Sequence, residues 1–461
     1  MNDRISIVGA GLGGTLAAIF LARRGLEVTL YESRPDLRRV ALPAGRSINL
    51  ALANRGLKPL RLAGLEPQVR RLLTVMRGRM VHPESGPLDF QPYGQRPREV
   101  IYSVSRPGLN ALLLDAAEAA GVRLEFGMRC TGADFERDLL NFERTATGEQ
   151  YSTALTPCIA ADGAGSVLRH ALLELPGYQG SEELLEHGYK ELCILPDADG
   201  RHRMNSNALH IWPRGGYMLI ALPNLDGSFT VTLFLPNEGE PSFAFLEKLS
   251  DGRSASSVPK GALRRFFERE FPDVTELIQD LEESFLANPT GLLGTVRCEP
   301  WHLDGRLLLL GDAAHAIVPF HGQGMNCAFE DCLELDRSLD ETGGDWAAAF
   351  AAFSMRRKPD ADAIAEMALE NYVEMRDSVR DPTFLLRKRV AFELERRFPE
   401  RFSPRYSLVM FRDDVPYAEA QHRGSIQAQI LLALTTGIDA ASDVDYRRAG
   451  LMIAERLEPL P

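Results

Sequence analysis

The stretch Gly9-Ala10-Gly11-Leu12-Gly13-Gly14 spaces its glycines as G-x-G-x-x-G. At this spacing Gly9 allows a tight turn, Gly11 lets the backbone approach a pyrophosphate, and Gly14 permits close packing of a helix on a strand. The diphosphate of a dinucleotide then meets the amide hydrogens and the positive dipole end of a helix N-terminus, which includes Leu12. The stretch therefore predicts dinucleotide binding.

The flanking segments place this motif in a βαβ unit. Residues 4–8 and 26–31 have the apolar pattern of buried strands, and residues 14–24 between them have a helical pattern. Glu32 ends the second strand, where its carboxylate can accept hydrogen bonds from two ribose hydroxyls. Because an acid here disfavours a 2′-phosphate, the motif favours the adenosine of FAD or NAD over that of NADP. We expect an α/β fold with a parallel, Rossmann-like sheet.

Composition and charge indicate a globular protein that acts on small molecules. The 461 residues are 45% hydrophobic and 25% charged, and 64 acidic against 52 basic side chains give a formal charge of −12. This charge disfavours nucleic acid and anionic membranes. The apolar run at 430–434 is too short for a membrane span, and the N-terminus shows no export signal. We expect a cytoplasmic monomer or homodimer with no membrane or nucleic-acid partner.

The cysteines predict free thiols. No two of the six form a C-x-x-C pair, which argues against a disulfide framework and against a zinc site. We therefore predict no metal.

The middle and the end of the chain depart from the nucleotide-binding pattern. Between about 187 and 236, alternating apolar segments separated by glycine turns predict an inserted antiparallel sheet. Residues 241–259, rich in Ser, Gly and Asp, predict a mobile loop. From residue 346 onward the periodicity predicts helices.

Two further signatures each end a strand-like apolar run. They are Ala161-Asp162-Gly163-Ala164-Gly165-Ser166 and Leu310-Gly311-Asp312-Ala313-Ala314-His315, and Gly322-Gln323-Gly324-Met325-Asn326 follows as a predicted helix start. Together with the first motif, in this order, they resemble the FAD-dependent class A aromatic hydroxylase family. The resemblance implies a Rossmann-like FAD-binding domain of the p-hydroxybenzoate hydroxylase type, an inserted antiparallel-sheet substrate domain and a helical C-terminal region.

The same resemblance implies bound FAD and assigns its contacts. Asp312 would bind the ribityl chain, Asp162 would support flavin and pyridine nucleotide, and Arg106 would contact the diphosphate region. Arg34 is expected beside the cofactor or at the surface. Amides of Gly324-Met325-Asn326 would face the flavin pyrimidine edge, where a helix N-terminus stabilises the negative charge of reduced flavin by ~0.3–2 kcal/mol.

More specific segments resemble the kynurenine 3-monooxygenase family within this class. They are residues 46–52, 77–82, 189–192, 209–213, 319–326 and 370–375. The resemblance implies hydroxylation of L-kynurenine to 3-hydroxy-L-kynurenine, in tryptophan degradation and pyridine nucleotide biosynthesis, with NADPH and O2 as co-substrates and a flavin C4a-hydroperoxide as the oxidant. The sequence holds no second G-x-G-x-x-G, so NADPH is expected to bind transiently to the flavin domain.

The resemblance also assigns the substrate contacts. Arg79 would grip the carboxylate of the amino-acid tail, Tyr93 and Tyr406 would add hydroxyl hydrogen bonds, and Asn371 would meet the tail. The remaining expected substrate or positioning residues are Glu374, Leu209, Met218, Ile220, Phe234, Met375, Pro319, Phe320 and His321. Because the aniline nitrogen of the substrate donates electrons itself, no protein base is predicted and no residue is assigned a catalytic role.

The resemblance divides the chain into interleaved domains. The FAD-binding domain is expected at residues 1–79, 97–178 and 294–345, the substrate domain at 80–96 and 179–293, and the helical region at 346–461.

Three other functions compete with this interpretation. A different aromatic hydroxylase would share the flavin signatures. A flavin-dependent halogenase needs a Trp-x-Trp-x-Ile-Pro run, which the three tryptophans, Trp212, Trp301 and Trp346, do not form. A non-catalytic carrier, such as a prenyl-protein escort factor, would keep the first glycine motif without needing Asp312.

Overall fold

The computed structural model describes residues 4–39, 49–250, 261–378 and 381–461. The first three residues of the segment at 46–52, and the part of the predicted loop that follows residue 250, lie outside these ranges. The chain forms two compact units. The first unit comprises Met1–Leu73, Val104–Leu184 and Gly294–Ala365, and the second comprises Thr74–Ser103, Leu185–Leu293 and Glu366–Pro461. The domain boundaries drawn from the sequence stay a prediction.

The first unit is built on a six-stranded sheet with the order β18-β19-β12-β1-β2-β8. Only β18 is antiparallel to its neighbour. The strands are β1 (Arg4–Val8), β2 (Glu27–Glu32), β8 (Arg123–Phe126), β12 (Cys158–Ala160), β18 (His302–Leu303) and β19 (Leu307–Leu309). The predicted parallel, Rossmann-like sheet is confirmed.

Helices cover this sheet because their apolar residues need burial. The long ones are α1 (Leu12–Arg23), α4 (Arg106–Ala119) and α11 (Gly324–Glu341), and α1 packs on both others. The shorter ones are α2 (Asn54–Leu62), α3 (Glu66–Arg70), α5 (Val167–Leu173), α10 (Asp312–His315), η1 (Leu37–Arg39) and η2 (Pro319–His321). Nine residues of α1 are buried, as expected of a helix enclosed by a sheet and two helices.

This unit also contains a small antiparallel sheet that was not predicted from the sequence. Its order is β11-β10-β9, from β9 (Met128–Asp134), β10 (Leu139–Arg144) and β11 (Gln150–Ala154). Three other short strands, not all of which lie within this unit, are β3 (Asn49–Leu52), β4 (Leu73–Met76) and β7 (Ile101–Ser105).

The second unit contains a seven-stranded sheet with the order β17-β13-β16-β15-β14-β5-β6. The strands β13 to β16 are antiparallel to one another, which confirms the predicted inserted antiparallel sheet. Their bounds are β5 (Gly78–Val81), β6 (Asp89–Pro92), β13 (Gln179–Ile194), β14 (Ala208–Pro213), β15 (Met218–Pro223), β16 (Phe229–Pro236) and β17 (Gly291–Glu299).

One face of this sheet is a core shared with four helices. Alternate strand residues, including Trp212, Leu219 and Leu233, join a buried cluster with α6 (Phe243–Ser250), α7 (Ala262–Glu270), α8 (Pro272–Thr275) and α9 (Leu281–Ala287). The prediction of a loop from residue 241 is wrong over α6. Phe243 and Leu246 stand three positions apart, so a helix buries both in this core.

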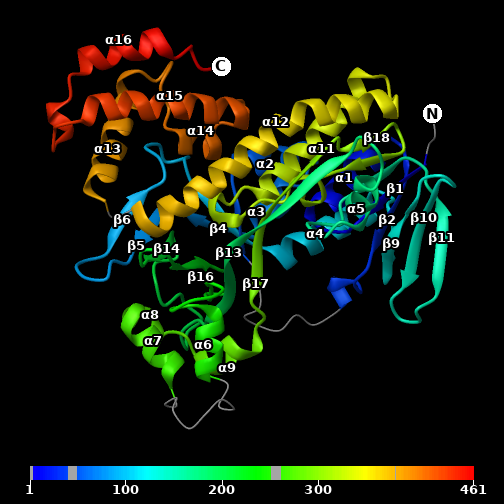
Figure 1. Cartoon of the computed structure of the whole chain (residues 1–461), viewed down its shortest axis with the longest axis horizontal. Coiled ribbons are helices and arrows are strands. Elements are labelled where there is room, and N and C mark those ends of the chain that lie inside the picture. The colour runs from blue at the N-terminus through cyan, green and yellow to red at the C-terminus, as the bar shows by residue number, and fades with distance from the viewer. Residues whose placement is uncertain (1–3, 40–48, 251–260, 379–380) are drawn as a thin grey trace. The chain divides into compact units, whose positions relative to one another are not determined.

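The C-terminal portion is helical, as predicted (Figure 1). It consists of α12 (Trp346–Val373), a π-helical turn η3 (Glu374–Ser378), α13 (Pro382–Arg397), α14 (Arg405–Phe411), α15 (Tyr417–Thr435), η4 (Ala441–Asp443) and α16 (Tyr446–Arg456). A separate core forms where α13, α15 and α16 pack together, with Val390, Leu394 and Ile430 at its centre. Over the described ranges, none of the helices has the length and apolarity that crossing a membrane requires.

Candidate active site

The glycine motif forms a cradle at the carboxyl end of β1. Gly9 has φ +105°, and a Cβ placed on it would lie 2.3 Å from the carbonyl oxygen of Ala161. A Cβ on Gly14 would lie 2.1 Å from the carbonyl oxygen of Gly9, so both positions exclude larger residues. Beside Gly11, in contrast, no atom lies within 4 Å of the Cβ position. The outer glycines thus permit tight packing, while the middle one leaves open space suited to a pyrophosphate.

Glu32 points back into this cradle from the end of β2. Its Oε2 accepts a hydrogen bond from the amide of Ala10 at 3.0 Å, and its Oε1 accepts from the amide and guanidinium of Arg34 at 2.9 and 2.8 Å. Burial acts to raise the pKa of Glu32, but the hydrogen bonds from Arg34 and Ala10 outweigh it and hold the pKa below its ordinary value. The side chain is therefore an ionised acceptor at neutral pH.

Parallel strands bring the second and third signatures to the same edge of the sheet. β12 ends just before Asp162 and β19 just before Gly311, and β12 is the neighbour of both β1 and β19. The buried guanidinium of Arg169 joins the two turns, because it donates to the carbonyl oxygens of Ala164 at 2.5 Å and Ala313 at 3.0 Å. The sheet topology thus brings the three signatures to one edge.

The two aspartates of these turns are in different environments. Asp162 Oδ2 accepts from the amide of Val167 at 3.0 Å, while its Oδ1 is buried without a hydrogen-bond partner. Burial raises the pKa of Asp162 above its ordinary value. The side chain of Asp312 is exposed on the first residue of α10. An orphaned buried oxygen and an exposed carboxylate at one edge are groups that FAD hydroxyls and amides can satisfy.

The N-terminus of α11 offers backbone donors. Cys327 is the first residue whose amide donates within the helix, to the carbonyl oxygen of Gln323 at 2.8 Å, so the amides of Gly324, Met325 and Asn326 precede the helical ladder. The side chain of Asn326 is buried, and it bonds the backbone of Ala51, Ala53 and Gly322 at 2.8–2.9 Å. The side chain of Asn326 is used to hold the loop, so Asn326 can reach a cofactor only through its backbone N–H.

Three polar residues border the glycine motif on other elements. Arg106 is exposed at the start of α4, and Arg34 is largely exposed beside Glu32. Asn110, which the sequence reading missed, donates to the carbonyl oxygen of Ala10 at 3.2 Å and has a buried Oδ1 without a partner. A lone asparagine on a helix gives no sequence signal. The set fits an FAD whose diphosphate lies at the α1 N-terminus.

The second unit holds a buried arginine among aromatic hydroxyls. The guanidinium carbon of Arg79, on β5, lies 5.1 Å from the ring centre of Tyr406, which stacks on Tyr93 at 5.8 Å. Its Nη1 lies 3.4 Å from Oε1 of Glu374. Burial acts to lower the pKa of Arg79, but Tyr406, Glu374 and Tyr93 outweigh it and raise the pKa above its ordinary value. The structure thus brings three predicted tail-binding residues, Arg79, Tyr93 and Tyr406, together with Glu374, and the guanidinium supplies a permanent positive charge.

Four of the predicted substrate residues, Leu209, Met218, Ile220 and Phe234, share the opposite face of the sheet from the helix-packed core. Leu209 pairs with Arg79 across β14 and β5, and Met218 pairs with Phe234 across β15 and β16. Ile220 lies two residues from Met218 and so points the same way. Met218 and Phe234 are buried, although no helix of the core cluster covers this face.

Two more of the predicted residues lie in or next to η3. Asn371 and Met375 are both buried, and the Nδ2 of Asn371 lies 3.4 Å from the sulfur of Met375. The amide of Gly216, in the β14–β15 turn, donates to Asp377 at 2.9 Å, which ties η3 to the sheet. The contact between Gly216 and Asp377 therefore helps to hold Asn371 and Glu374 in position.

Lys388 is a neighbour of Arg79 that the sequence reading did not identify. It lies on α13, and its Nζ donates to Oε1 of Gln91 at 3.3 Å. Burial, with a smaller contribution from Arg79, lowers the pKa of Lys388 to about 8. A lysine in an amphipathic helix is normally a surface residue, so only the folded structure singles it out.

Pro319, Phe320 and His321 form η2 of the first unit, where Phe320 and His321 are buried and Pro319 is exposed. Their predicted positioning role stays a prediction.

Comparison with known proteins agrees with these features. The family model described as "FAD binding domain" matches residues 3–248 and 292–368. A protein of Myxococcus xanthus named kynurenine 3-monooxygenase is 49% identical over 459 residues, which is 99% of this chain and 96% of that protein. One of Stenotrophomonas maltophilia with the same name is 48% identical over 456 residues, or 99% and 97% of the two chains.

Solved structures with low identity share the fold. The chain resembles 2-methyl-3-hydroxypyridine-5-carboxylic acid oxygenase with a TM-score of 0.63 and 22% identity, over 83% of this chain and 95% of that one. It also resembles PqsL of P. aeruginosa with a TM-score of 0.62 and 20% identity, over 81% and 96% of the two chains. With near full-length identity of about half to proteins of one name, the chain belongs to the kynurenine 3-monooxygenase family of flavoproteins that carry this FAD-binding domain.

Proposed function

We propose that the chain hydroxylates L-kynurenine to 3-hydroxy-L-kynurenine, with FAD as bound cofactor and NADPH and O2 as co-substrates. The observation that carries this proposal is the buried Arg79, with Tyr93, Tyr406 and Glu374 around it, beside an apolar sheet face. Such a cluster suits a ligand that has an amino-acid tail at one end and an aromatic ring at the other. The similarity to relatives named kynurenine 3-monooxygenase supports the choice of this ligand.

The charges of the cluster complement the zwitterionic tail. Arg79 binds the carboxylate of kynurenine, and Glu374, with a side chain that is 29% exposed, accepts from its ammonium group. The hydroxyls of Tyr93 and Tyr406 and the amide of Asn371 add neutral hydrogen bonds. A charge-assisted contact contributes about 1.5–3 kcal/mol, which is enough to orient a small substrate.

The sheet face holds the aryl ring. Leu209, Met218, Ile220 and Phe234 present apolar groups on one side of the second unit's sheet, and Met375 adds a flexible thioether. These residues exclude water from the ring, and they carry no group that could transfer a proton. The amine ortho to the hydroxylated carbon supplies electron density, so the chain needs no base at this position.

The first unit provides the contacts for FAD. In this proposal Glu32 binds the adenosine ribose, Gly11 and Leu12 bind the diphosphate through the backbone, and Asp312 binds the ribityl chain. Arg106 and Asp162 add a guanidinium and a carboxyl oxygen. When bound, FAD supplies the transfer of electrons from NADPH to dioxygen. The amides that begin α11 hold negative charge on the reduced pyrimidine ring.

The free thiols and the charge fit action inside a reducing compartment. The six cysteines are unpaired, and the formal charge is −12. From the free thiols we propose a cytoplasmic location. We also propose that the protein is a monomer or homodimer. Cell fractionation and the molar mass of the FAD-loaded protein in solution check both statements.

Turnover of the purified protein tests the function. We expect FAD to co-purify, NADPH oxidation to accelerate when L-kynurenine is added, and the product to carry oxygen from O2 at carbon 3 by mass spectrometry and NMR. Parallel reactions with 4-hydroxybenzoate and 2-aminobenzoate distinguish other aromatic hydroxylases. The proposal would be overturned if NADPH oxidation ran at full rate without kynurenine and did not change when kynurenine was added. It would also be overturned if a hydroxylated product formed only from another aromatic compound.

A further inference from the structure

A single buried carboxylate holds both ends of the turn that carries Asp312. Asp331, on α11, has no exposed surface. Its Oδ2 accepts from the amide of Gly311 at 3.1 Å and from Nε2 of His315 at 2.7 Å, and these two residues bracket α10. Since an ionised carboxylate only accepts, the proton lies on Nε2 of His315. Asp312 is thus presented between two anchored neighbours.

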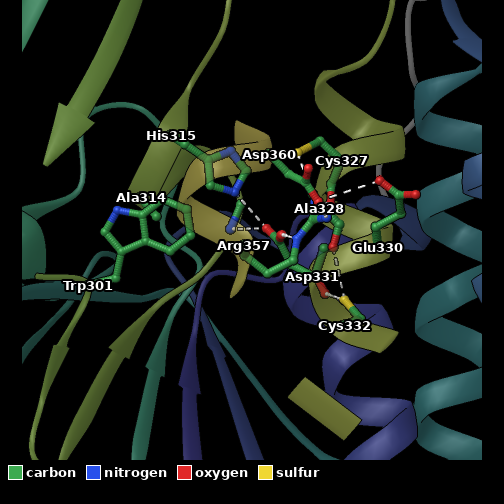
Figure 2. A network of polar contacts seen from close by, with 12 residues as sticks. Trp301, Ala314, His315, Cys327, Ala328, Glu330, Asp331, Cys332, Arg357 and Asp360 are labelled. Atoms are coloured by element: carbon green, nitrogen blue, oxygen red, sulfur yellow. Dashed lines mark hydrogen bonds and ion pairs between the residues drawn. The ribbon is translucent and has the colours of Figure 1, made fainter. Parts of the chain in front are cut away.

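Arg357 fixes the direction of that carboxylate. Figure 2 shows its guanidinium beside Asp331, where Nε donates to Oδ1 at 2.8 Å. Burial acts to raise the pKa of Asp331, but the interactions with His315 and Arg357 lower it to about 2. The carboxylate is therefore ionised throughout the neutral range, and each of its oxygens has a separate task. Oδ1 is held by α12, while Oδ2 holds the α10 turn.

The cluster is not a cation site, although it contains three groups with metal-ligating atoms. Ligand atoms of His315, Cys327 and Asp331 lie within 4.8 Å of one another. Arg357 already supplies the positive charge among them, and its Nη2 lies 3.2 Å from the sulfur of Cys327. Burial raises the pKa of Cys327, so the thiol is protonated and poorly suited to a metal. The groups serve one another rather than an ion.

The helix that carries Asp331 also contacts the first glycine motif. Ala328 packs closely against both turns. A Cβ added to Gly13 would lie 3.3 Å from the Cβ of Ala328, and a Cβ added to Gly311 would lie 3.2 Å from it. The thiol of Cys332 donates to the carbonyl oxygen of Gly13 at 3.3 Å. One face of α11 therefore sets the spacing between the diphosphate motif and the α10 turn. The N-terminal amides of α11 are part of the same rigid element.

We infer that Asp331 is a positioning residue for FAD. Through Gly311 and His315 it fixes the Asp312 carboxylate relative to the amides that begin α11. The ribityl chain of FAD can then bind Asp312 while its pyrimidine ring binds these amides. The inference rests on the FAD site of the proposed function, but not on kynurenine as substrate. It predicts that Asp331 contributes to FAD affinity beyond its contribution to the stability of the apoprotein.

The test is Asp331→Asn, which keeps shape but removes the charge and one acceptor. FAD is removed and then titrated back, with quenching of flavin fluorescence giving Kd and melting temperature recorded with and without FAD. We expect Kd to rise at least about tenfold and the FAD-dependent gain in melting temperature to shrink. A lower melting temperature of the apoprotein with an unchanged FAD Kd would overturn the inference, because it would show a purely structural role.

Glu99→Gln is the matched control. Glu99 is a buried carboxylate of the second unit that accepts from the amides of Gln95 and Arg96 at 2.7 and 2.9 Å. Its replacement should lower stability and leave the FAD Kd unchanged. If the control weakens FAD as much as Asp331→Asn does, the effect is general and the inference fails.

A second pair of variants covers the case in which Asp331→Asn does not fold. His315→Leu keeps the Asp331–Arg357 ion pair and removes one of the two anchors, so FAD Kd should rise about threefold to tenfold. His315→Gln places an amide nitrogen where Nε2 stood and should restore most of the affinity. Wild-type FAD affinity in His315→Leu would contradict the inference. A wild-type protein that binds FAD normally but does not turn over kynurenine would instead count against the proposed function alone.

Discussion

Arg79 and Glu374 are 295 positions apart in the chain, and their side chains form an ion pair with Nη1 3.4 Å from Oε1. Arg79 comes from a sheet strand and Glu374 from the π-helical turn η3, while Tyr406 of α14 lies over the guanidinium. Three segments that are distant in sequence thus enclose one charge. A buried ion pair with no other purpose is often replaceable by apolar residues at little cost to stability, which makes this pair a good candidate for ligand recognition.

Replacement of Arg79 tests tail recognition. Arg79→Met should raise the KM and Kd for L-kynurenine by about tenfold to 150-fold, because a charge-assisted contact of about 1.5–3 kcal/mol is lost. Substrate titration of the FAD-loaded variant, followed by flavin absorbance, measures the Kd. Tyr406→Phe keeps the ring beside the guanidinium and should cost less. Equal affinities in wild type and Arg79→Met would contradict the assignment.

Asp312→Asn separates cofactor binding from folding. Because this side chain is exposed, the melting temperature of the apoprotein should change little, whereas the FAD Kd should rise about tenfold through loss of a charge-assisted hydrogen bond. Flavin fluorescence titration and thermal unfolding of the apoprotein supply the two values. The ribityl role is wrong if FAD binds this variant as tightly as the wild type.

Glu32 links stability to acid pH. Its pKa is lowered from 4.5 in the folded state, so its stabilising contribution is complete above about pH 4.5 and disappears as pH falls through the folded pKa. Glu32→Gln should weaken FAD binding and flatten the dependence of melting temperature on pH below 4.5. Arg34→Gln leaves the Ala10 hydrogen bond in place and should have the smaller effect. Identical acid profiles in wild type and Glu32→Gln would argue against this linkage.

Lys388 links stability to alkaline pH with the opposite sign. Its pKa is lowered from 10.5 to about 8, so between these values the unfolded chain binds more protons than the folded one. Its contribution to stability therefore rises with pH from about 8 to 10.5. Lys388→Met, which removes a charge near Arg79, Glu374 and Asp89, should abolish this rise and stabilise the protein below pH 8. Chemical unfolding at pH 7, 8.5 and 10 measures both effects.

Local patterns were sufficient for many of the regular elements of the fold. The glycine motif, the strands around it and the helices after residue 346 were predictable, because period and turn residues depend on neighbours in sequence. The helix at Phe243–Ser250 was missed, since its Ser- and Gly-rich surroundings concealed two apolar residues that the core buries. The small sheet at residues 128–154 was missed as well, because its short strands carry many polar residues.

By itself, the sequence determined the dinucleotide motif, the parallel sheet and the order of the flavin signatures. The reason is that glycine spacing and the repeat of apolar residues set local backbone structure through contacts between neighbours in sequence. Tertiary structure alone decided that Asp331 grips the turn beside Asp312, that Arg169 joins two signature loops, and that Lys388 lies near Arg79. Burial and the loss of water set the protonation of such groups, and burial depends on which distant segments pack together.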